Sequence, residues 1–365
     1  MSELTEEQQE IVGAVRAIAD RHAGSAAIRE AFGGVTQKLW ETLAGEVGAA
    51  AIAIPEEYDG VGMTAVESHL ILETLGEYLA PTPFLSSAVL GAGALLASGD
   101  DDACGRLLPG IAAGETIATL GWASPAGEWD PDASALEAVP AGETWEVSGV
   151  SPLVLDGAQA DLVLAIARTP SGPALFEITE AEAITRRATP ALDPTMNFAE
   201  LAFEKVPARL LSDSADVISS VRDTFLIALT ALQVGAAARG LAMTVEYAGQ
   251  RVQFGRPIGS FQALKHRMAD MHVSLETSRS ISRAAARALA EGSSDVSRLA
   301  AMAKAWCSDA LNLIASETIQ LHGGIAITWE HDAHLVFKRA HALDQLLGQA
   351  SDQRQRLAGT LGLSG

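Results

Sequence analysis

The chain has 365 residues, of which 48% are hydrophobic and 19% are charged, and its formal net charge is −21. This composition excludes an intrinsically disordered chain and indicates a globular protein of two or three domains. So negative a protein has no electrostatic reason to coat nucleic acid or an anionic membrane, and neither is expected as a partner.

The cysteine content and the shortness of the apolar runs indicate the cellular compartment in which the protein is expected. Cys104 and Cys307 cannot form a disulfide framework, and their spacing fits no metal site. The acidic, polar start is not a signal peptide, and no apolar run reaches the roughly 18 residues of a membrane span. We therefore expect a cytoplasmic protein that binds no metal.

The apolar pattern predicts helices, then strands, then helices. Residues 1–118 are expected to form a helical domain, with capping boxes at Thr5–Gln8 and Thr64–Glu67. Short segments bounded by Gly, Pro and Asp predict a small β domain over 119–211. Residues 212–365 predict an antiparallel bundle of four helices. These helices are expected at about 213–250, 260–291, 294–323 and 331–360.

The best-defined motif is Arg251-Val-Gln-Phe-Gly-Arg-Pro-Ile-Gly-Ser-Phe-Gln262. It combines two arginines, a turn with glycine and proline, and a helix that is expected to begin at Ser260. Helix N-termini and arginine side chains both favour phosphate oxygens. By its chemistry alone, the motif fits a phosphate site and an ordinary helix–helix turn with solvated arginines about equally well.

The second motif is Gln320-Leu-His-Gly-Gly-Ile-Ala-Ile-Thr328. Its two glycines let a backbone come close to a ligand, but alone it fits better the C-cap of a helix with a hydrogen-bonded histidine. The stretch Gly60-Val-Gly-Met-Thr-Ala65 matches a dinucleotide pattern only superficially, because it lies between helices. No signature of a phosphate-binding P-loop, a zinc protease or a serine hydrolase is present.

Together, the order of elements, the loop Ile54–Gly62 and the two motifs resemble acyl-CoA dehydrogenases over nearly the whole chain. The resemblance implies an N-terminal helical domain, a central β-barrel or sandwich and a C-terminal four-helix bundle. It also implies FAD as cofactor, an acyl-CoA substrate that is oxidised to a 2-enoyl-CoA, and electron-transfer flavoprotein as the acceptor.

The resemblance also assigns residues to the cofactor. In this family the two motifs bind the ADP half of an FAD that is largely housed in the neighbouring subunit, so the site is shared across an interface and a lone monomer is not expected. The positions that match are Arg251, Phe254, Gln262, Gln320, Gly323 and Gly324.

The sequence departs from the family at the catalytic base. Removal of the α-proton needs a carboxylate within hydrogen-bonding distance. Counted without gaps, the two positions at which the family places its Glu hold Leu347 and Phe225. The flavin side is also changed, because the Thr, Ser and Trp residues expected at 123–130 and 153–155 are mostly replaced. Only Ser124 keeps a hydroxyl there.

Three interpretations remain open. In the favoured one, the chain is a non-catalytic subunit that completes the FAD site of a catalytic partner, like the partner chains of actinobacterial α2β2 dehydrogenases of the steroid-CoA type. In the second, a homodimer or homotetramer is active through a displaced carboxylate, for which Asp344, Asp223 and Glu330 are candidates, although each is more simply a solvated surface carboxylate. In the third, the chain is a scaffold or binding protein without a flavin.

Overall fold

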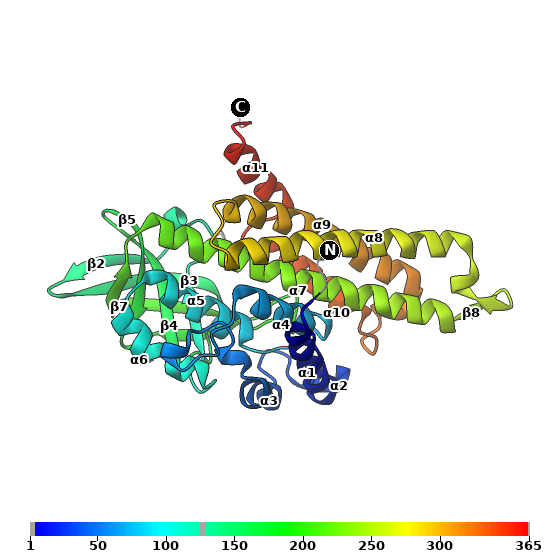
Figure 1. Ribbon diagram of the computed structural model, residues 1–365, viewed down its shortest axis with the longest axis horizontal. Coiled ribbons are helices and arrows are strands. Elements are labelled where there is room, and N and C mark those ends of the chain that lie inside the picture. Colours follow the sequence, from blue (N-terminus) through cyan, green and yellow to red (C-terminus); the bar gives the residue numbers. More distant parts are fainter. Residues whose placement is uncertain (1–3, 125–128, 364–365) are drawn as a thin grey trace. The chain divides into compact units, whose positions relative to one another are not determined.

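The computed structural model describes residues 4–124 and 129–363 (Figure 1). The chain divides into two compact units. The first contains Met1–Arg29, His69–Ala80 and Leu226–Gly365, and the second contains Glu30–Ser68 and Pro81–Phe225. The predicted domain boundaries after residues 118 and 211 stay a sequence prediction, although the strands of the large sheet all lie between Ala118 and Ser212.

Long helices build the first unit. Those that lie wholly or mostly in it are α1 (Glu6–His22), α2 (Ser25–Glu30), α4 (Ala65–Glu77), α7 (Ala215–Gln250), α8 (Gln262–Ala290), α9 (Val296–His322), α10 (Ala333–Gln345) and α11 (Ala350–Thr360). The helices of the second unit are α3 (Gln37–Val47), a π-helix (Phe84–Gly91), α5 (Ala92–Ser98) and α6 (Asp101–Ala112). The expected order of helices, strands and helices is confirmed.

The capping box at the first helix is confirmed. The Thr5 hydroxyl accepts from the Gln8 backbone N–H at 3.2 Å, and the Gln8 side chain accepts from the Thr5 N–H at 3.2 Å. At α4 the Glu67 carboxylate likewise accepts from the Thr64 N–H at 3.0 Å. The Thr64 hydroxyl accepts from Val66, however, so the second box takes a different form. Both arrangements satisfy N–H groups that a helix start leaves free.

Two predicted helix limits in the bundle were wrong. Ser260 does not cap α8, because its hydroxyl donates to the Pro257 carbonyl at 2.7 Å and the helix begins at Gln262. The single last helix, expected over 331–360, is two helices, α10 and α11. The break lies at Leu347 and Gly348, whose φ angles of 57° and 88° are left-handed and cannot continue a right-handed helix.

The apolar character of α7 also exceeds the expectation. The sequence was expected to contain no apolar run long enough for a membrane span, but α7 includes an 18-residue window with a mean hydropathy of 1.6. Within the protein, 83% of that window is buried. A helix that is apolar on all sides and covered by other elements is typical of a core helix, and this burial accounts for its composition.

The central sheet closes into a small barrel. Its strands are β1 (Ala118–Gly121), β2 (Glu137–Ala141), β3 (Thr144–Leu155), β4 (Leu162–Thr169), β5 (Gly172–Ile178), β6 (Thr185–Thr189) and β7 (Phe198–Ser212). Pairing runs β4–β2–β3–β7–β5 and returns from β5 to β4, while β1 also pairs with β4 and β6 with β7. The ring is completed between β2 and β4 by one pair, Glu137 opposite Arg168. Apolar residues such as Val147, Phe176 and Leu201 fill the interior.

A buried ion pair joins α4 to α8 in the first unit. The Glu73 carboxylate, 5% exposed, accepts from Arg279 Nε at 2.8 Å and from Arg283 Nη2 at 3.0 Å. Burial alone would raise the pKa of Glu73, but Arg283 and Arg279 together lower it below its usual value. Glu73 is therefore ionised at neutral pH, and its charge is matched inside the unit.

We expect Glu73→Ala to lower the free energy of unfolding by about 3–5 kcal/mol, because Arg283 and Arg279 lose the buried carboxylate that they share, although Arg279 keeps Glu276 as a second partner. The matched control is Glu137→Ala, whose carboxylate pairs with Arg168 at 2.7 Å but is 65% exposed, and it should lose at most about 1 kcal/mol. Urea denaturation measures both. Since the native pKa of Glu73 is lowered, its stabilisation is present above the unfolded pKa and is lost as the pH falls through the native one. Equal losses in the two variants would contradict this account.

Candidate functional site

The two predicted nucleotide-binding motifs lie at the same end of the first unit. The Arg251 N–H donates to the Tyr247 carbonyl at 2.8 Å, which places Arg251 one turn beyond Tyr247 at the end of α7. The Tyr247 ring stacks on His322 with 4.6 Å between centroids, and His322 directly precedes Gly323. The stack therefore brings the arginine of the first motif beside the glycines of the second.

An ion pair ties the remaining motif residues to this end. Arg267 Nε on α8 lies 2.5 Å from Glu317 Oε2 on α9. Gln262 is the first residue of α8, shortly before Arg267, and Gln320 follows Glu317 within one turn of α9. Gln262 and Gln320 are both exposed. The structure thus gathers the polar side chains of both motifs on neighbouring helices of one unit.

A short hairpin forms the tip of the first motif. It consists of β8 (Val252–Gln253) and β9 (Arg256–Pro257), with Phe254 and Gly255 at the turn. Phe254 has a φ of 53°, which is strained for a non-glycine residue, and its side chain is 91% exposed. An apolar ring held out of the protein on a strained backbone is typical of a residue that contacts another molecule.

Arg256 makes a contact that no sequence pattern indicated. Its guanidinium carbon lies 4.1 Å from the centroid of the Phe261 ring, and Phe261 precedes the first residue of α8. This cation–π contact holds a positive charge beside the N-terminus of α8, whose N-cap residue makes no side-chain hydrogen bond. The aromatic residue before Gln262 was the signal that could have revealed it.

The glycines of the second motif leave a flat, open surface. Gly323 caps α9, as predicted, with φ 64° and ψ −145°, a combination essentially confined to glycine. A Cβ atom at Gly323 or Gly324 would meet nothing within 4 Å, so both face open space. The predicted hydrogen bond of the histidine is also present, because His322 Nδ1 lies 2.7 Å from the Thr318 carbonyl oxygen, whereas its Nε2 is buried without a partner among the described residues.

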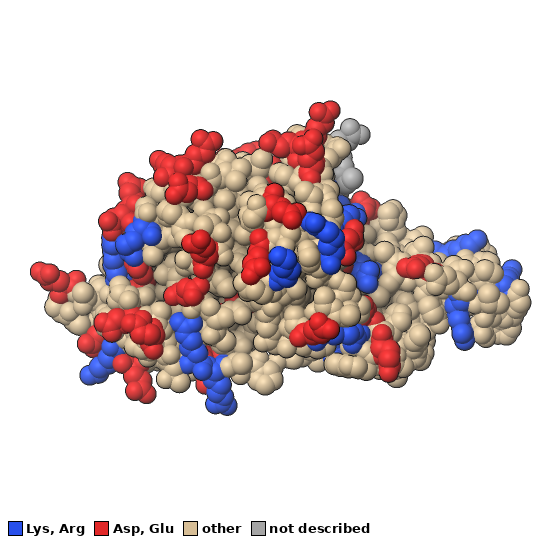
Figure 2. Space-filling model, turned by 90° about the horizontal axis from the view of Figure 1, so that it is seen from below, with Lys and Arg blue, Asp and Glu red and all other residues tan. Residues whose placement is uncertain are grey.

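These features fit the ADP half of FAD. Within the described residues Arg251 and Arg256 have no carboxylate partner, and the first N–H groups of α8 have no side-chain cap. Figure 2 shows basic side chains and no acidic ones at the end that carries the β8–β9 hairpin, although acidic groups are spread over the rest of that face. Free arginines beside a helix N-terminus provide donors for a pyrophosphate. Exposed Phe254 and the open glycines supply apolar and backbone surface.

Neither family position for the base carries a carboxylate that could take a proton. Leu347 is 6% exposed, and its carbonyl accepts from Gln353 Nε2 at 2.6 Å. Phe225 is 1% exposed on α7 and packs edge-on against Trp129. Both side chains are buried hydrocarbon, so neither position supplies a proton acceptor.

The turn that carries Leu347 is held by a buried lysine, which the sequence analysis missed. Lys304 on α9 is fully buried, and its Nζ donates to the carbonyl oxygens of Asp344 at 3.1 Å and Gly348 at 3.2 Å. It also bonds the Ser308 hydroxyl at 3.1 Å. Burial lowers the pKa of Lys304 to about 8. A single lysine in an otherwise apolar helical stretch was the available signal.

Of the three fallback carboxylates, one agrees with the expected solvated group. Asp344 is half-buried near the end of α10, and the helix ends at Gln345, before Leu347. Asp223 is not a surface carboxylate: it is 2% exposed, and its Oδ1 lies 3.6 Å from Arg222 Nε. Glu330 is exposed in the turn before α10, as expected of a solvated group. None of the three lies at a family position for the base.

On the flavin side, two predicted stretches adjoin in the second unit. The Trp122 N–H donates to the Ser151 hydroxyl at 3.2 Å, which links the start of the first stretch to the approach to Leu153. Ser124 is buried, while the carbonyl of Leu155 accepts from Thr119 at 2.5 Å. Part of the first stretch, 125–128, lies outside the described residues.

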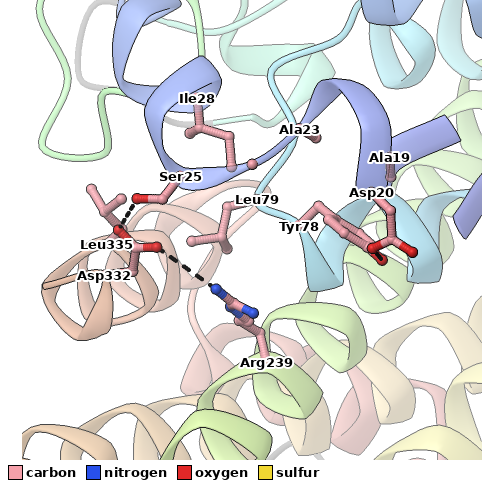
Figure 3. A pocket seen from close by; sticks show the side chains of 11 residues that line it. Ala19, Asp20, Ala23, Ser25, Ile28, Tyr78, Leu79, Arg239, Asp332 and Leu335 are labelled. Carbon is pink, nitrogen blue, oxygen red and sulfur yellow. Dashed lines mark hydrogen bonds and ion pairs between the residues drawn. The ribbon is translucent and has the colours of Figure 1, made fainter. Parts of the chain in front are cut away.

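A small cavity beside the second motif has a structural role. Asp332, at the start of α10, accepts hydrogen bonds from Ser25 and Arg29 at 2.7 Å each and lies 3.7 Å from Arg239 (Figure 3). Burial alone would raise the pKa of Asp332, but the hydrogen bonds from Ser25 and Arg29 outweigh it and lower the pKa. The cavity measures about 130 Å³, below the size of an acyl-CoA pocket. The contacts anchor α2 to α10.

We expect Lys304→Met to lower the free energy of unfolding by about 1–3 kcal/mol at neutral pH, because buried carbonyls lose their donor. The native pKa of about 8 lies below the ordinary value of 10.5, so between them the unfolded chain binds the extra proton and stability rises with pH. The advantage of the wild type over Lys304→Met should therefore grow from pH 8 to 10, by at most about 1.4 kcal/mol per unit. Urea unfolding across this range measures it, and a constant difference would refute the assignment.

Comparison with known proteins identifies the family. The acyl-CoA dehydrogenase C-terminal domain model matches residues 226–361, and the N-terminal domain model matches residues 5–115. Acyl-CoA dehydrogenase IpdE2 of Mycobacterium tuberculosis is 39% identical over 355 residues, which is 96% of each chain.

Two solved structures are similar over almost their full lengths. A chain of the ChsE4–ChsE5 complex from Mycobacterium tuberculosis superimposes with a TM-score of 0.92 and 29% identity, covering 99% of both chains. A variant of the Tcur3481–Tcur3483 steroid ACAD gives a TM-score of 0.90 and 31% identity over 98% of both. With the barrel, the bundle and both motifs in place, the chain belongs to the acyl-CoA dehydrogenase family of FAD-dependent acyl-CoA oxidoreductases.

Proposed function

We propose that this chain is a non-catalytic subunit of an acyl-CoA dehydrogenase and that it completes the FAD site of a catalytic partner chain. The proposal rests on a contrast between the residues at the family's ADP-binding positions and those at its positions for the catalytic base. The residues for the ADP half are present and exposed, whereas Leu347 and Phe225 are buried hydrocarbon where the base belongs. A subunit that contributes phosphate contacts to a neighbour needs the ADP-binding residues but no catalytic base of its own.

The work of this chain is to bind and orient. Arg251 and Arg256, with the free N–H groups of α8, neutralise a pyrophosphate, and Phe254 covers an apolar part of the cofactor. FAD, when bound, supplies the hydride acceptor for the oxidation of the acyl-CoA. The proton from the α-carbon goes to a carboxylate of the partner chain, because general-base catalysis needs a group within hydrogen-bonding distance.

The solved relatives support the assembly and the substrate class. The ChsE4–ChsE5 structure is a complex of two different chains, and the Tcur3481–Tcur3483 protein is described as a steroid ACAD. By this likeness we assign the chain to an α2β2 assembly that oxidises a steroid-type acyl-CoA in the cytoplasm and passes electrons to electron-transfer flavoprotein. A closed two-fold assembly would present the exposed motif end of this chain to a neighbour.

The flavin content of the purified protein tests the proposal. The chain alone should be colourless near about 450 nm, the region of flavin absorbance, and the complex with its catalytic partner should carry one flavin per pair. A chain that is yellow by itself and is bleached by an acyl-CoA would instead establish an independent dehydrogenase. Its base would then be sought with Asp344→Asn, Asp223→Asn and Glu330→Gln. A complex without any flavin would support a scaffold.

Arg251→Ala should weaken FAD binding by the complex by about tenfold or more, because a charge-assisted hydrogen bond to phosphate contributes about 1.5–3 kcal/mol. Assembly itself should be unchanged by size-exclusion chromatography. The matched control is Arg187→Ala on β6, an 80% exposed arginine, which should leave FAD affinity as it was. Loss of FAD equally in both variants would show that Arg251 is no cofactor contact.

A further inference from the structure

Three aromatic side chains form a contiguous buried cluster in the second unit. The Trp122 and Trp129 rings meet at 5.9 Å between centroids and 72° between planes, and Trp129 meets Phe225 at 5.5 Å and 81°. Their exposed fractions are 0%, 8% and 1%. Such edge-to-face packing is a preferred geometry for aromatic pairs, so the two contacts hold the Trp129 ring between the other two rings.

The positions of the three residues in the sequence relate this cluster to the family's flavin contacts and catalytic base. Trp122 follows β1 and is tied by its N–H to Ser151, between the two stretches that correspond to the family's flavin contacts. Trp129 belongs to the first of these stretches, and Phe225 stands at one of the family's two positions for the base. The side chain of Trp129 therefore belongs to a stretch that corresponds to the family's flavin contacts, and it packs against the residue at one of the positions for the base.

The cluster does not suit an isoalloxazine ring. Such a ring carries several carbonyl and nitrogen atoms that need hydrogen-bond partners when buried. The three side chains offer two indole N–H donors and no acceptor, and Trp122 Nε1 is buried without a hydrogen-bond partner in the part of the chain that the structure describes. Packing of aromatic faces and edges has replaced polar contacts here.

We propose that Trp129, packed between Trp122 and Phe225, is an aromatic plug that closes this chain's own flavin position. The inference deepens the proposed function, since it gives a physical reason why flavin is held only in the partner's site. The chain then cannot regain a flavin merely by acquiring phosphate contacts from a neighbour, because the space for the ring is filled by its own side chain.

The plug is tested on the full chain alone with lumiflavin, an isoalloxazine without ribose or phosphate, by titrating flavin fluorescence. Wild type should show no saturable binding, and Trp129→Ala should bind at least about tenfold more tightly. Trp129→Phe keeps a ring and should behave like wild type. The matched control is Trp145→Ala, which removes a tryptophan packed edge-on to Phe176 at 5.4 Å in the barrel, and it should also behave like wild type.

Saturable binding by the wild type, as tight as by Trp129→Ala, would overturn the plug. So would a folded Trp129→Ala, shown by near-ultraviolet circular dichroism, that still fails to bind. Should Trp129→Ala not fold, Trp129→Leu is measured in the same way, since it keeps an apolar side chain without a ring. No partner chain enters these titrations, so they succeed or fail separately from the flavin content of the complex.

Discussion

The buried Lys304 holds the turn that carries Leu347, one of the two positions at which the sequence predicts the base of this family. Taking an ammonium group out of water is costly, and the protein offsets that cost with backbone carbonyls from the end of α10 and from Gly348. The same contacts determine where α10 stops and α11 begins. The backbone of this turn, including a left-handed residue, is therefore fixed around a leucine, whose side chain cannot accept a proton.

The two sets of residues at the family's cofactor positions have opposite character. At the motif end of the first unit, arginines, glycines and a strained phenylalanine are exposed, and among the described residues neither Arg251 nor Arg256 has a carboxylate partner. In the second unit, the stretches that correspond to flavin contacts are packed with indole and phenyl rings. Exposed, unpaired donors cost little in water and gain their bonds on assembly, whereas buried aromatic packing is complete within the chain. A subunit that gives contacts to a cofactor it does not hold needs this combination.

Charge acts locally in this protein. A net charge of −21 repels an anionic cofactor at long range, yet interactions between exposed charges are screened beyond about 10 Å in salt. The basic hairpin end and the helix N-terminus beside it therefore dominate at the distance of a hydrogen bond.

The order of elements, the capping box at Thr5 and the glycine C-cap at Gly323 were determined by the sequence, because each depends on residue identity at one position or on local periodicity. The sequence also shows that positions 225 and 347 hold no carboxylate. The positions of Arg251 and Gln320 within recognisable motifs belong to the same class. What the sequence could not give is any contact between distant segments. Trp129 against Phe225, Lys304 beneath Gly348 and the single pair that closes the barrel all join residues that no local pattern relates.

The misjudged features share one physical cause. The break at Leu347 needs a left-handed residue without glycine, which propensity argues against and which Lys304 and Gln353 enforce through their hydrogen bonds. Asp223 is buried although a carboxylate is normally solvated, and the apolar run in α7 is covered by the rest of the protein. The sequence shows which side chains could bind a phosphate or accept a proton. Whether such a side chain is buried or exposed depends on packing over the whole chain, so only the tertiary structure decides it.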